Sequence, residues 1–192
     1  MIINISNRQR ASLVGVLIIV AYSMLTYSIT KNITLGVITD ILSGIAVIGI
    51  PILLFPIFNT TEHKRLNFVY LISRFIEGIL MIIGGVIILN PSLESYRAII
   101  YSDIQIYFFI SGALFFYILL YRTLIIPKFI SIWGIVATLI LFIITIIRLF
   151  GIESEILNAL LIPMILNELF LAVWLIIKGF YFENIDLSTQ DK

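Results

Sequence analysis

Long apolar runs separated by short polar segments dominate the pattern along the chain. A helix that crosses the hydrocarbon core of a membrane, about 30 Å thick, needs about 20 residues at about 1.5 Å each. Six apolar runs reach that length, and they cover residues 12–30, 35–58, 66–89, 104–126, 129–150 and 155–178. Because the connecting segments are short, consecutive helices should pack antiparallel in one bundle. The pattern predicts an all-α polytopic membrane protein: a single six-transmembrane-helix domain over residues 1–192, in which residues 179–192 form a short polar cytoplasmic tail.

The composition gives the same class of protein and excludes several functions. The 192 residues are 61% hydrophobic and 12% charged, whereas a soluble domain carries about 25% charged residues. The apolar excess must therefore face lipid, so the lipid bilayer is the expected partner. A net charge of +1 gives no indication of the strongly basic surface that binds nucleic acid. With no cysteine and one histidine, the sequence predicts neither a metal site nor a cofactor. That histidine, His63, is expected to be a solvated residue of a cytoplasmic loop.

Basic residues are distributed unequally between the two ends of the predicted bundle. One end holds seven of them: Arg8, Arg10, Lys64, Arg65, Arg122, Lys128 and Lys178. The other end holds three: Lys31, Arg97 and Arg148. Because cytoplasmic loops carry the excess of Lys and Arg, both termini are predicted to be cytoplasmic. The isoleucine-rich composition is typical of an AT-rich bacterial genome, so the expected location is the bacterial inner (plasma) membrane.

One face of the third predicted helix is polar or small, although the helix lies within the membrane. At 100° per residue, an arc of about 120° collects eight residues: Asn67, Tyr70, Arg74, Glu77, Gly78, Met81, Gly84 and Gly85. The rest of the circumference is largely Leu, Ile, Phe and Val. A charged residue at the centre of a membrane helix costs about 2.5–3.5 kcal/mol on insertion. This face is therefore expected to turn toward the bundle.

The charges on that face have a potential partner in the sixth predicted helix. Arg74 and Glu77 stand three residues apart and can pair with each other. Asn167 and Glu168 lie near the middle of the sixth helix, and counting from the helix ends places Glu77 and Glu168 at similar depth. If the two helices meet, one arginine faces two carboxylates, and such a cluster tends to lose its net negative charge by protonation or by binding a cation. Arg74, Glu77, Asn167 and Glu168 are therefore the candidate ligand- or proton-binding residues. The structural alternatives are that Arg74 bridges the two helices while one glutamate stays protonated and, for Asn167, an interhelical hydrogen bond.

A second group of charges lies near the outer ends of the predicted helices. Asp40, Asp103 and Arg148 belong to this group, and Arg148 and Asp103 could pair with Asp40 or Glu153. We expect them to form an outer ring of salt bridges whose role is mainly structural.

Three classes of function remain open. The leading hypothesis is that the Arg–Glu–Glu site binds or translocates a small polar solute or a proton. The competing hypothesis is a structural or interaction subunit, either a homo-oligomer or part of a membrane complex. A third is an intramembrane enzyme that acts on lipid, which is less favoured because no nucleophile elbow, P-loop, dinucleotide fingerprint or HExxH motif is present.

Several stretches together carry a resemblance that covers nearly the whole chain in order. They are NRQRASLVGVL (7–17), IAVIGIPILLFPIF (45–58), YLISRFIEGILMIIGG (70–85), LLYRTLIIPKFISIWGIVA (119–137) and ILNELFLAVWLIIKGF (165–180). In these stretches the sequence resembles a bacterial six-helix membrane family, domain-of-unknown-function family 4386. The resemblance implies a single six-helix domain in a bacterial membrane. It brings no established activity, but the polar segments SRFIE and LNE fall within the matching stretches.

Overall fold

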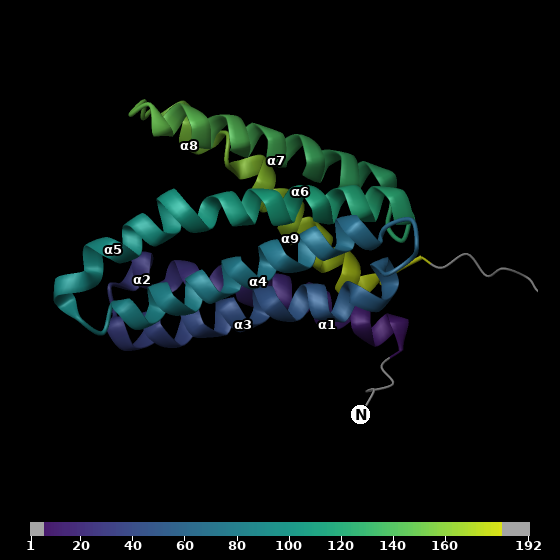
Figure 1. Ribbon diagram of the computed structural model, residues 1–192, viewed down its shortest axis with the longest axis horizontal. Coiled ribbons are helices and arrows are strands. Elements are labelled where there is room, and N and C mark those ends of the chain that lie inside the picture. The colour runs from purple at the N-terminus through teal and green to yellow at the C-terminus, as the bar shows by residue number, and fades with distance from the viewer. Residues whose placement is uncertain (1–5, 182–192) are drawn as a thin grey trace, which may run out of the picture.

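The computed structural model describes residues 6–181, and most of them are helical (Figure 1). Six helical segments are long and apolar enough to cross a membrane: Asn7–Thr30, Ile33–Phe58, Lys64–Ile87, Pro91–Thr123, Lys128–Leu149 and Glu155–Ile177. Within the described part of the chain there is no strand. The prediction of an all-α bundle with six membrane-length helices is therefore confirmed.

Three of the six segments are uninterrupted and three are not. The uninterrupted helices are α3 (Ile33–Phe58), α4 (Lys64–Ile87) and α7 (Lys128–Leu149). The first segment consists of α1 (Asn7–Ala21), the 3-10 turn η1 (Tyr22–Leu25) and α2 (Thr26–Thr30). The fourth consists of η2 (Pro91–Leu93), α5 (Glu94–Ile99), the π-helical turn η3 (Ile100–Gln105) and α6 (Ile106–Thr123). The sixth consists of α8 (Glu155–Ala159) and α9 (Ile162–Ile177).

Helix boundaries differ most from the prediction at the starts of the first and fourth segments. The first helix begins at Asn7 rather than residue 12, because Ser6 and Gln9 form a capping box that satisfies its first backbone donors. The fourth segment begins at Pro91 rather than residue 104. At this start, the side chain of Asn90 accepts a hydrogen bond from the backbone N–H of Ser92. Both extensions contain several charged and polar residues, so hydropathy alone does not detect them. Of the predicted polar tail, residues 182–192 lie outside the described residues.

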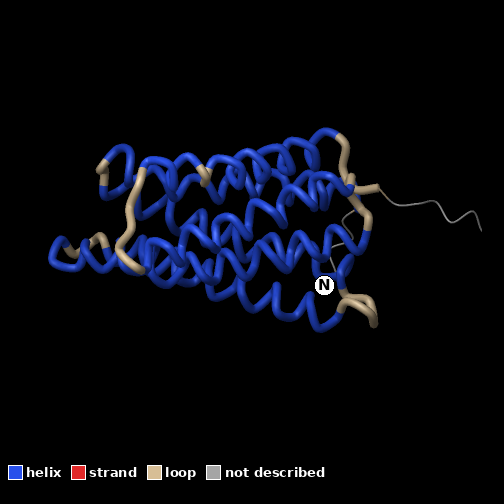
Figure 2. The backbone as a smooth tube through the Cα atoms, turned by 90° about the horizontal axis from the view of Figure 1, so that it is seen from above, coloured by secondary structure: helices blue, strands red, loops and turns tan. Residues whose placement is uncertain are grey.

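The helices run along one long axis, and the loops gather mainly at its two ends (Figures 1 and 2). Arg8 in α1 donates hydrogen bonds to the carbonyl oxygens of Ile176 and Ile177 at the end of α9. The backbone N–H of Tyr181 donates to Ile125 O, which lies in the loop between α6 and α7. Both ends of the described chain therefore lie at one end of the bundle. The side of the membrane that this end faces stays a prediction from the loop charges.

Close packing of α3 against α4 fixes which face of α4 turns inward. Gly44 and Gly78 meet at this contact, where a Cβ atom on either glycine would lie about 2.6 Å or less from the other's carbonyl oxygen. Small residues of this kind allow membrane helices to approach backbone to backbone. All eight residues of the predicted polar face of α4 are buried. The predicted orientation of that face is therefore confirmed.

Candidate functional site

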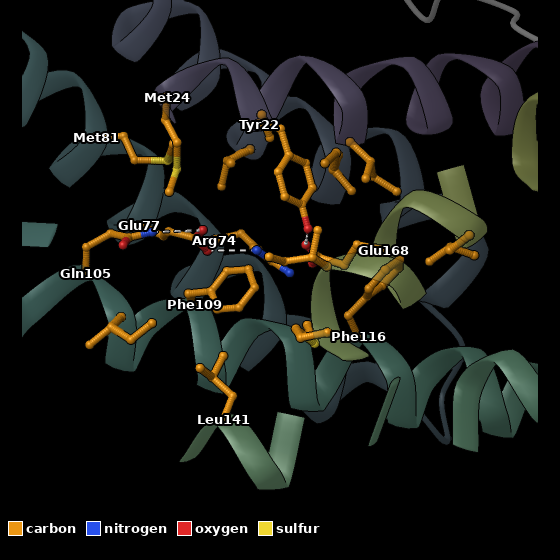
Figure 3. A pocket seen from close by; sticks show the side chains of 18 of the residues that line it. Tyr22, Met24, Arg74, Glu77, Met81, Gln105, Phe109, Phe116, Leu141 and Glu168 are labelled. Carbon is orange, nitrogen blue, oxygen red and sulfur yellow. Dashed lines mark hydrogen bonds and ion pairs between the residues drawn. The ribbon is translucent and has the colours of Figure 1, made fainter. Parts of the chain in front are cut away.

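A cavity of about 260 Å³ lies in the interior of the bundle, lined by residues from all six membrane-length segments (Figure 3). Most of the lining is aliphatic or aromatic. Its polar residues are Tyr22, Tyr70, Arg74, Glu77, Gln105, Tyr117 and Glu168. Arg74 and Glu77 lie within two residues of the midpoint of Lys64–Ile87, and Glu168 lies two residues beyond the midpoint of Glu155–Ile177. The charged part of the cavity is therefore near the middle of the membrane-length helices.

Arg74 and Glu77 form an ion pair at the wall of the cavity. Arg74 Nη1 lies 2.9 Å from Glu77 Oε2, and the two side chains are 7% and 2% exposed. Their spacing of three residues on α4 places both on one face of the helix. The other carboxylate oxygen of Glu77 accepts a 3.3 Å hydrogen bond from Gln105 Nε2. Glu77 is thus held by one cationic donor and one neutral donor.

The packing around Arg74 keeps its guanidinium group beside aromatic rings. The guanidinium carbon lies 5.3 Å from the ring centre of Phe109 and 6.0 Å from that of Tyr70. Gly112 on α6 leaves room for the arginine, since a Cβ atom there would lie 2.9 Å from Arg74 Nε. The aromatic faces stabilise the buried cation. The two aromatic rings and Gly112 therefore give the Arg74 side chain a defined position inside the bundle.

Glu168 faces the same cavity from α9 but has a different partner. Its Oε2 accepts a 2.7 Å hydrogen bond from the hydroxyl of Tyr22 in η1. In Figure 3 the head group of Arg74 lies between the carboxylates of Glu77 and Glu168, and Arg74 interacts electrostatically with both. Glu168 is only partly buried. Among the described residues, Glu168 thus receives a hydrogen bond from a neutral donor and none from a cation.

The structure brings Glu77 and Glu168 to one cavity without direct packing of their helices. The main neighbours of α4 are α3 and α6, and those of α9 are α1 and α7. The two carboxylates consequently approach each other across the cavity. The sequence predicted that one arginine would face two carboxylates if the two helices met. The two helices are not main neighbours, and Arg74, Glu77 and Glu168 instead line one common cavity.

The backbone is irregular at several points around the cavity. Tyr22 opens the 3-10 turn η1, Gln105 closes the π-helical turn η3, and Leu161 is the N-cap residue of α9. All three residues line the cavity. Irregular backbone at membrane depth is tolerated where it is buried in protein or lines a cavity, and π-helical turns occur frequently at functional sites.

Asn167 is adjacent to Glu168 in sequence but points to a different part of the bundle. Its Nδ2 donates a 3.1 Å hydrogen bond to the carbonyl oxygen of Ile130 on α7, and the residue is fully buried. It is not among the residues that line the cavity. Asn167 therefore links α9 to α7, as expected for an interhelical hydrogen bond.

The three residues of the expected outer ring are engaged separately. Asp40 pairs with Arg97, whose Nη2 and Nε lie 2.8 and 3.0 Å from Asp40 Oδ2. Arg148 donates a hydrogen bond to the side chain of Asn158. Asp103 accepts one from Ser102. Within the described residues, no hydrogen bond or ion pair joins Asp40, Asp103 and Arg148 to one another.

His63 does not have the solvated position expected for it. Its side chain is 7% exposed, and its Nδ1 is buried without a hydrogen bond among the described residues. The residue lies in the turn between α3 and α4 and immediately precedes α4 as its N-cap residue. The expectation of a solvated loop histidine was therefore wrong.

The sequence did not identify Tyr22, Gln105 and Arg97 as the respective hydrogen-bond partners of Glu168, Glu77 and Asp40. Tyr22 and Glu168 are 146 residues apart, and Arg97 and Asp40 are 57 apart, so no local periodicity connects them. Of these three partners, only Gln105 could have been recognised in the sequence, because an amide in an apolar helix requires a buried partner.

The fold and the ionisable cavity define a polytopic helical membrane protein. Residues 21–179 match the family model described as Domain of unknown function (DUF4386), and the chain belongs to this family. The matched region includes the cavity residues Tyr22, Arg74, Glu77, Gln105 and Glu168. No curated protein and no solved structure matches the chain.

Proposed function

We propose that the protein binds a proton or a small polar solute in its interior cavity, with Glu168 as the binding group. The observation that carries this proposal is the charge balance of the lining. It contains one cation, Arg74, and two carboxylates, Glu77 and Glu168, so the ionised cluster carries a net charge of −1. A net charge within a membrane-embedded, apolar cavity is costly unless a proton or a cation neutralises it.

The two carboxylates differ in whether they contact Arg74 directly. Glu77 makes the 2.9 Å contact with Arg74 and also accepts from Gln105. Glu168 accepts from the Tyr22 hydroxyl, which is a neutral group. Breaking the Arg74–Glu77 contact would leave two buried charges without a direct partner. Glu168 is therefore the carboxylate that can bind and release a proton or solute at the lower cost in free energy.

The interrupted helices around the cavity support the proposal that the site binds and releases a ligand. In membrane transporters, substrate and ion sites commonly lie near the bilayer midplane where helices are discontinuous. Here η1, η3 and the start of α9 all contribute lining residues. This resemblance in architecture supports binding more directly than translocation, which would additionally require access from both sides.

The proposal includes an orientation and a location. The end of the bundle that contains the seven basic residues would face the cytoplasm of a bacterial cell, with the six helices in its inner membrane. The distribution of Lys and Arg supports the orientation.

Infrared difference spectroscopy tests the proposal because a protonated carboxyl group has its own C=O stretching band. The ionisable groups that share the cavity with Glu168 are Tyr22 from the first segment, Tyr70, Arg74 and Glu77 from α4, and Tyr117 from α6. We expect purified protein to show a carboxyl band that changes between mildly acidic and mildly alkaline pH and is absent in Glu168→Gln. A band that is identical in parent and Glu168→Gln, together with binding isotherms for small solutes that the substitution does not alter, would refute the proposal.

A further inference from the structure

We infer that the solute held in this cavity is a small organic amine, with a singly charged ammonium group bound at Glu168 and an apolar body in the remaining space. This inference rests on the proposed function and narrows it to one chemical class of ligand. Three features of the lining carry it: its charge, its aromatic rings and its size.

The charge of the lining matches a monovalent cation. An ammonium ion would restore neutrality to a site that contains Arg74, Glu77 and Glu168. An anion would have to compete with Glu77 for Arg74 and would also meet the carboxylate of Glu168. A neutral solute would leave the net charge in place. Charge-assisted hydrogen bonds to a carboxylate are the strongest available here, so the amine is favoured.

A metal ion fits this site less well than an organic cation. Metal sites in proteins require several oxygen, nitrogen or sulfur ligands at once. Within the described part of the chain, no group of three or more His, Cys, Asp or Glu side chains could hold a metal ion. The cavity offers one carboxylate that is free of a cationic hydrogen-bond donor, which suits a single ammonium group.

Four aromatic side chains line the cavity that Glu168 faces, and two of them, Tyr70 and Phe109, also lie beside Arg74. Tyr70 and Phe116 stack with their ring centres 5.4 Å apart, and Phe116 lies 5.3 Å from Tyr117. These three rings and that of Phe109 line the cavity. Aromatic faces attract ammonium groups through their electron density, more strongly when water is excluded. The phenolic oxygen of Tyr117 is buried without a hydrogen bond among the described residues, so it is available as an additional acceptor.

The size and polarity of the remaining space limit how large and how polar the rest of the amine ligand can be. A volume of about 260 Å³ corresponds to roughly nine waters at about 30 Å³ each. Besides the charged and aromatic residues, the lining is mainly aliphatic and thioether side chains, among them Ile18, Ile50, Met81, Leu141, Met164 and Leu171. A body the size of one aromatic ring with a short chain suits this space, whereas a polyamine would place further charges against apolar walls.

Calorimetric titration of the full-length protein in lipid nanodiscs tests the inference with three probes of similar shape. They are 2-phenylethylammonium, the neutral 2-phenylethanol and the anionic 3-phenylpropionate. Empty nanodiscs correct for partitioning into lipid. We expect the ammonium probe to bind roughly tenfold or more tightly than the alcohol, and the carboxylate probe to bind most weakly. Glu168→Gln should lose roughly tenfold or more in affinity for the ammonium probe.

Glu153→Gln is the matched control, because it makes the same chemical change at an exposed residue outside the cavity. It should bind the ammonium probe like the parent, and thermal unfolding of both variants shows that they are folded. Tighter binding of 3-phenylpropionate, or equal binding of amine and alcohol, would overturn the inference. If no probe binds while the infrared band of Glu168 still responds to pH, the amine inference fails and the proposed proton site stands.

Discussion

The hydroxyl of Tyr22 donates a 2.7 Å hydrogen bond to Glu168, and this contact joins the interrupted first segment to the last helix across 146 residues of sequence. Tyr22 is the first residue of η1, where the α-helix gives way to a 3-10 turn. The turn and the hydrogen bond together place a neutral donor on a carboxylate in the interior of the bundle. Glu168 is thereby oriented toward the cavity, and no cationic side chain in residues 6–181 forms a hydrogen bond or ion pair with it.

Replacing Tyr22 with Phe removes this hydrogen bond and leaves most of the ring packing in place. We expect Tyr22→Phe to lower the free energy of unfolding by about 1–2 kcal/mol, because it removes a hydrogen bond to a partly buried carboxyl group. Unfolding in detergent by heat or denaturant measures the effect. Tyr96→Phe, at an exposed tyrosine, is the control and should change stability by less than about 0.5 kcal/mol. Equal stability of Tyr22→Phe and the parent would show that the hydrogen bond does not matter to the fold.

The Asp40–Arg97 pair should behave as a structural bridge, in contrast to Glu168. Arg97 also lies over the rings of Tyr27 and Tyr101, with its guanidinium carbon 4.9 and 4.4 Å from the ring centres. Breaking a buried pair on one side costs about 3–5 kcal/mol, whereas replacing both partners is often nearly neutral. Arg97→Met should therefore destabilise strongly, and adding Asp40→Asn should recover much of the loss. A double-mutant cycle on unfolding measures the coupling.

Additive effects of Asp40→Asn and Arg97→Met would contradict this account of the pair. A further check uses the ligand probes of the cavity. Because Asp40 and Arg97 do not line it, Asp40→Asn combined with Arg97→Met should leave binding of the ammonium probe unchanged.

The absence of cysteine makes the orientation directly measurable. Single cysteines can be placed at exposed residues of opposite ends, Thr61 between α3 and α4 and Ser92 between α4 and α5. In intact bacterial cells, a membrane-impermeant thiol reagent should label Ser92→Cys, and it should label Thr61→Cys after permeabilisation. The reverse pattern would show that the loop rich in basic residues faces outward, against the positive-inside prediction.

The sequence could predict those parts of the site that depend on local periodicity. Arg74 and Glu77 share a helix, so their spacing alone predicts their pairing, and the eight-residue face of α4 follows from the same 100° rotation. The common depth of Glu77 and Glu168 also followed from counting along apolar segments. These predictions required no knowledge of how the helices pack.

The remaining features depend on packing that local patterns do not encode. Tyr22 reaches Glu168 because the first helix is interrupted at that residue, and hydropathy contains no signal for a 3-10 turn. Asp40 was expected to belong to an outer ring of salt bridges, in which Arg148 could pair with it. Arg97 reaches it instead, from a polar helix that precedes the apolar run. His63 was expected in solvent because its neighbours are polar, yet its side chain is buried.

The central claim is that Glu168 is kept for binding rather than for stability, and the free energies of unfolding of Glu168→Gln and Glu77→Gln test it most directly. Glu77→Gln removes the direct partner of Arg74 and should cost about 3–5 kcal/mol. Glu168→Gln keeps an oxygen that can accept from Tyr22 and removes a net charge from the cavity, so it should be as stable as the parent or more stable. If Glu168→Gln instead loses as much stability as Glu77→Gln, the three charges form a structural network and the binding account is contradicted.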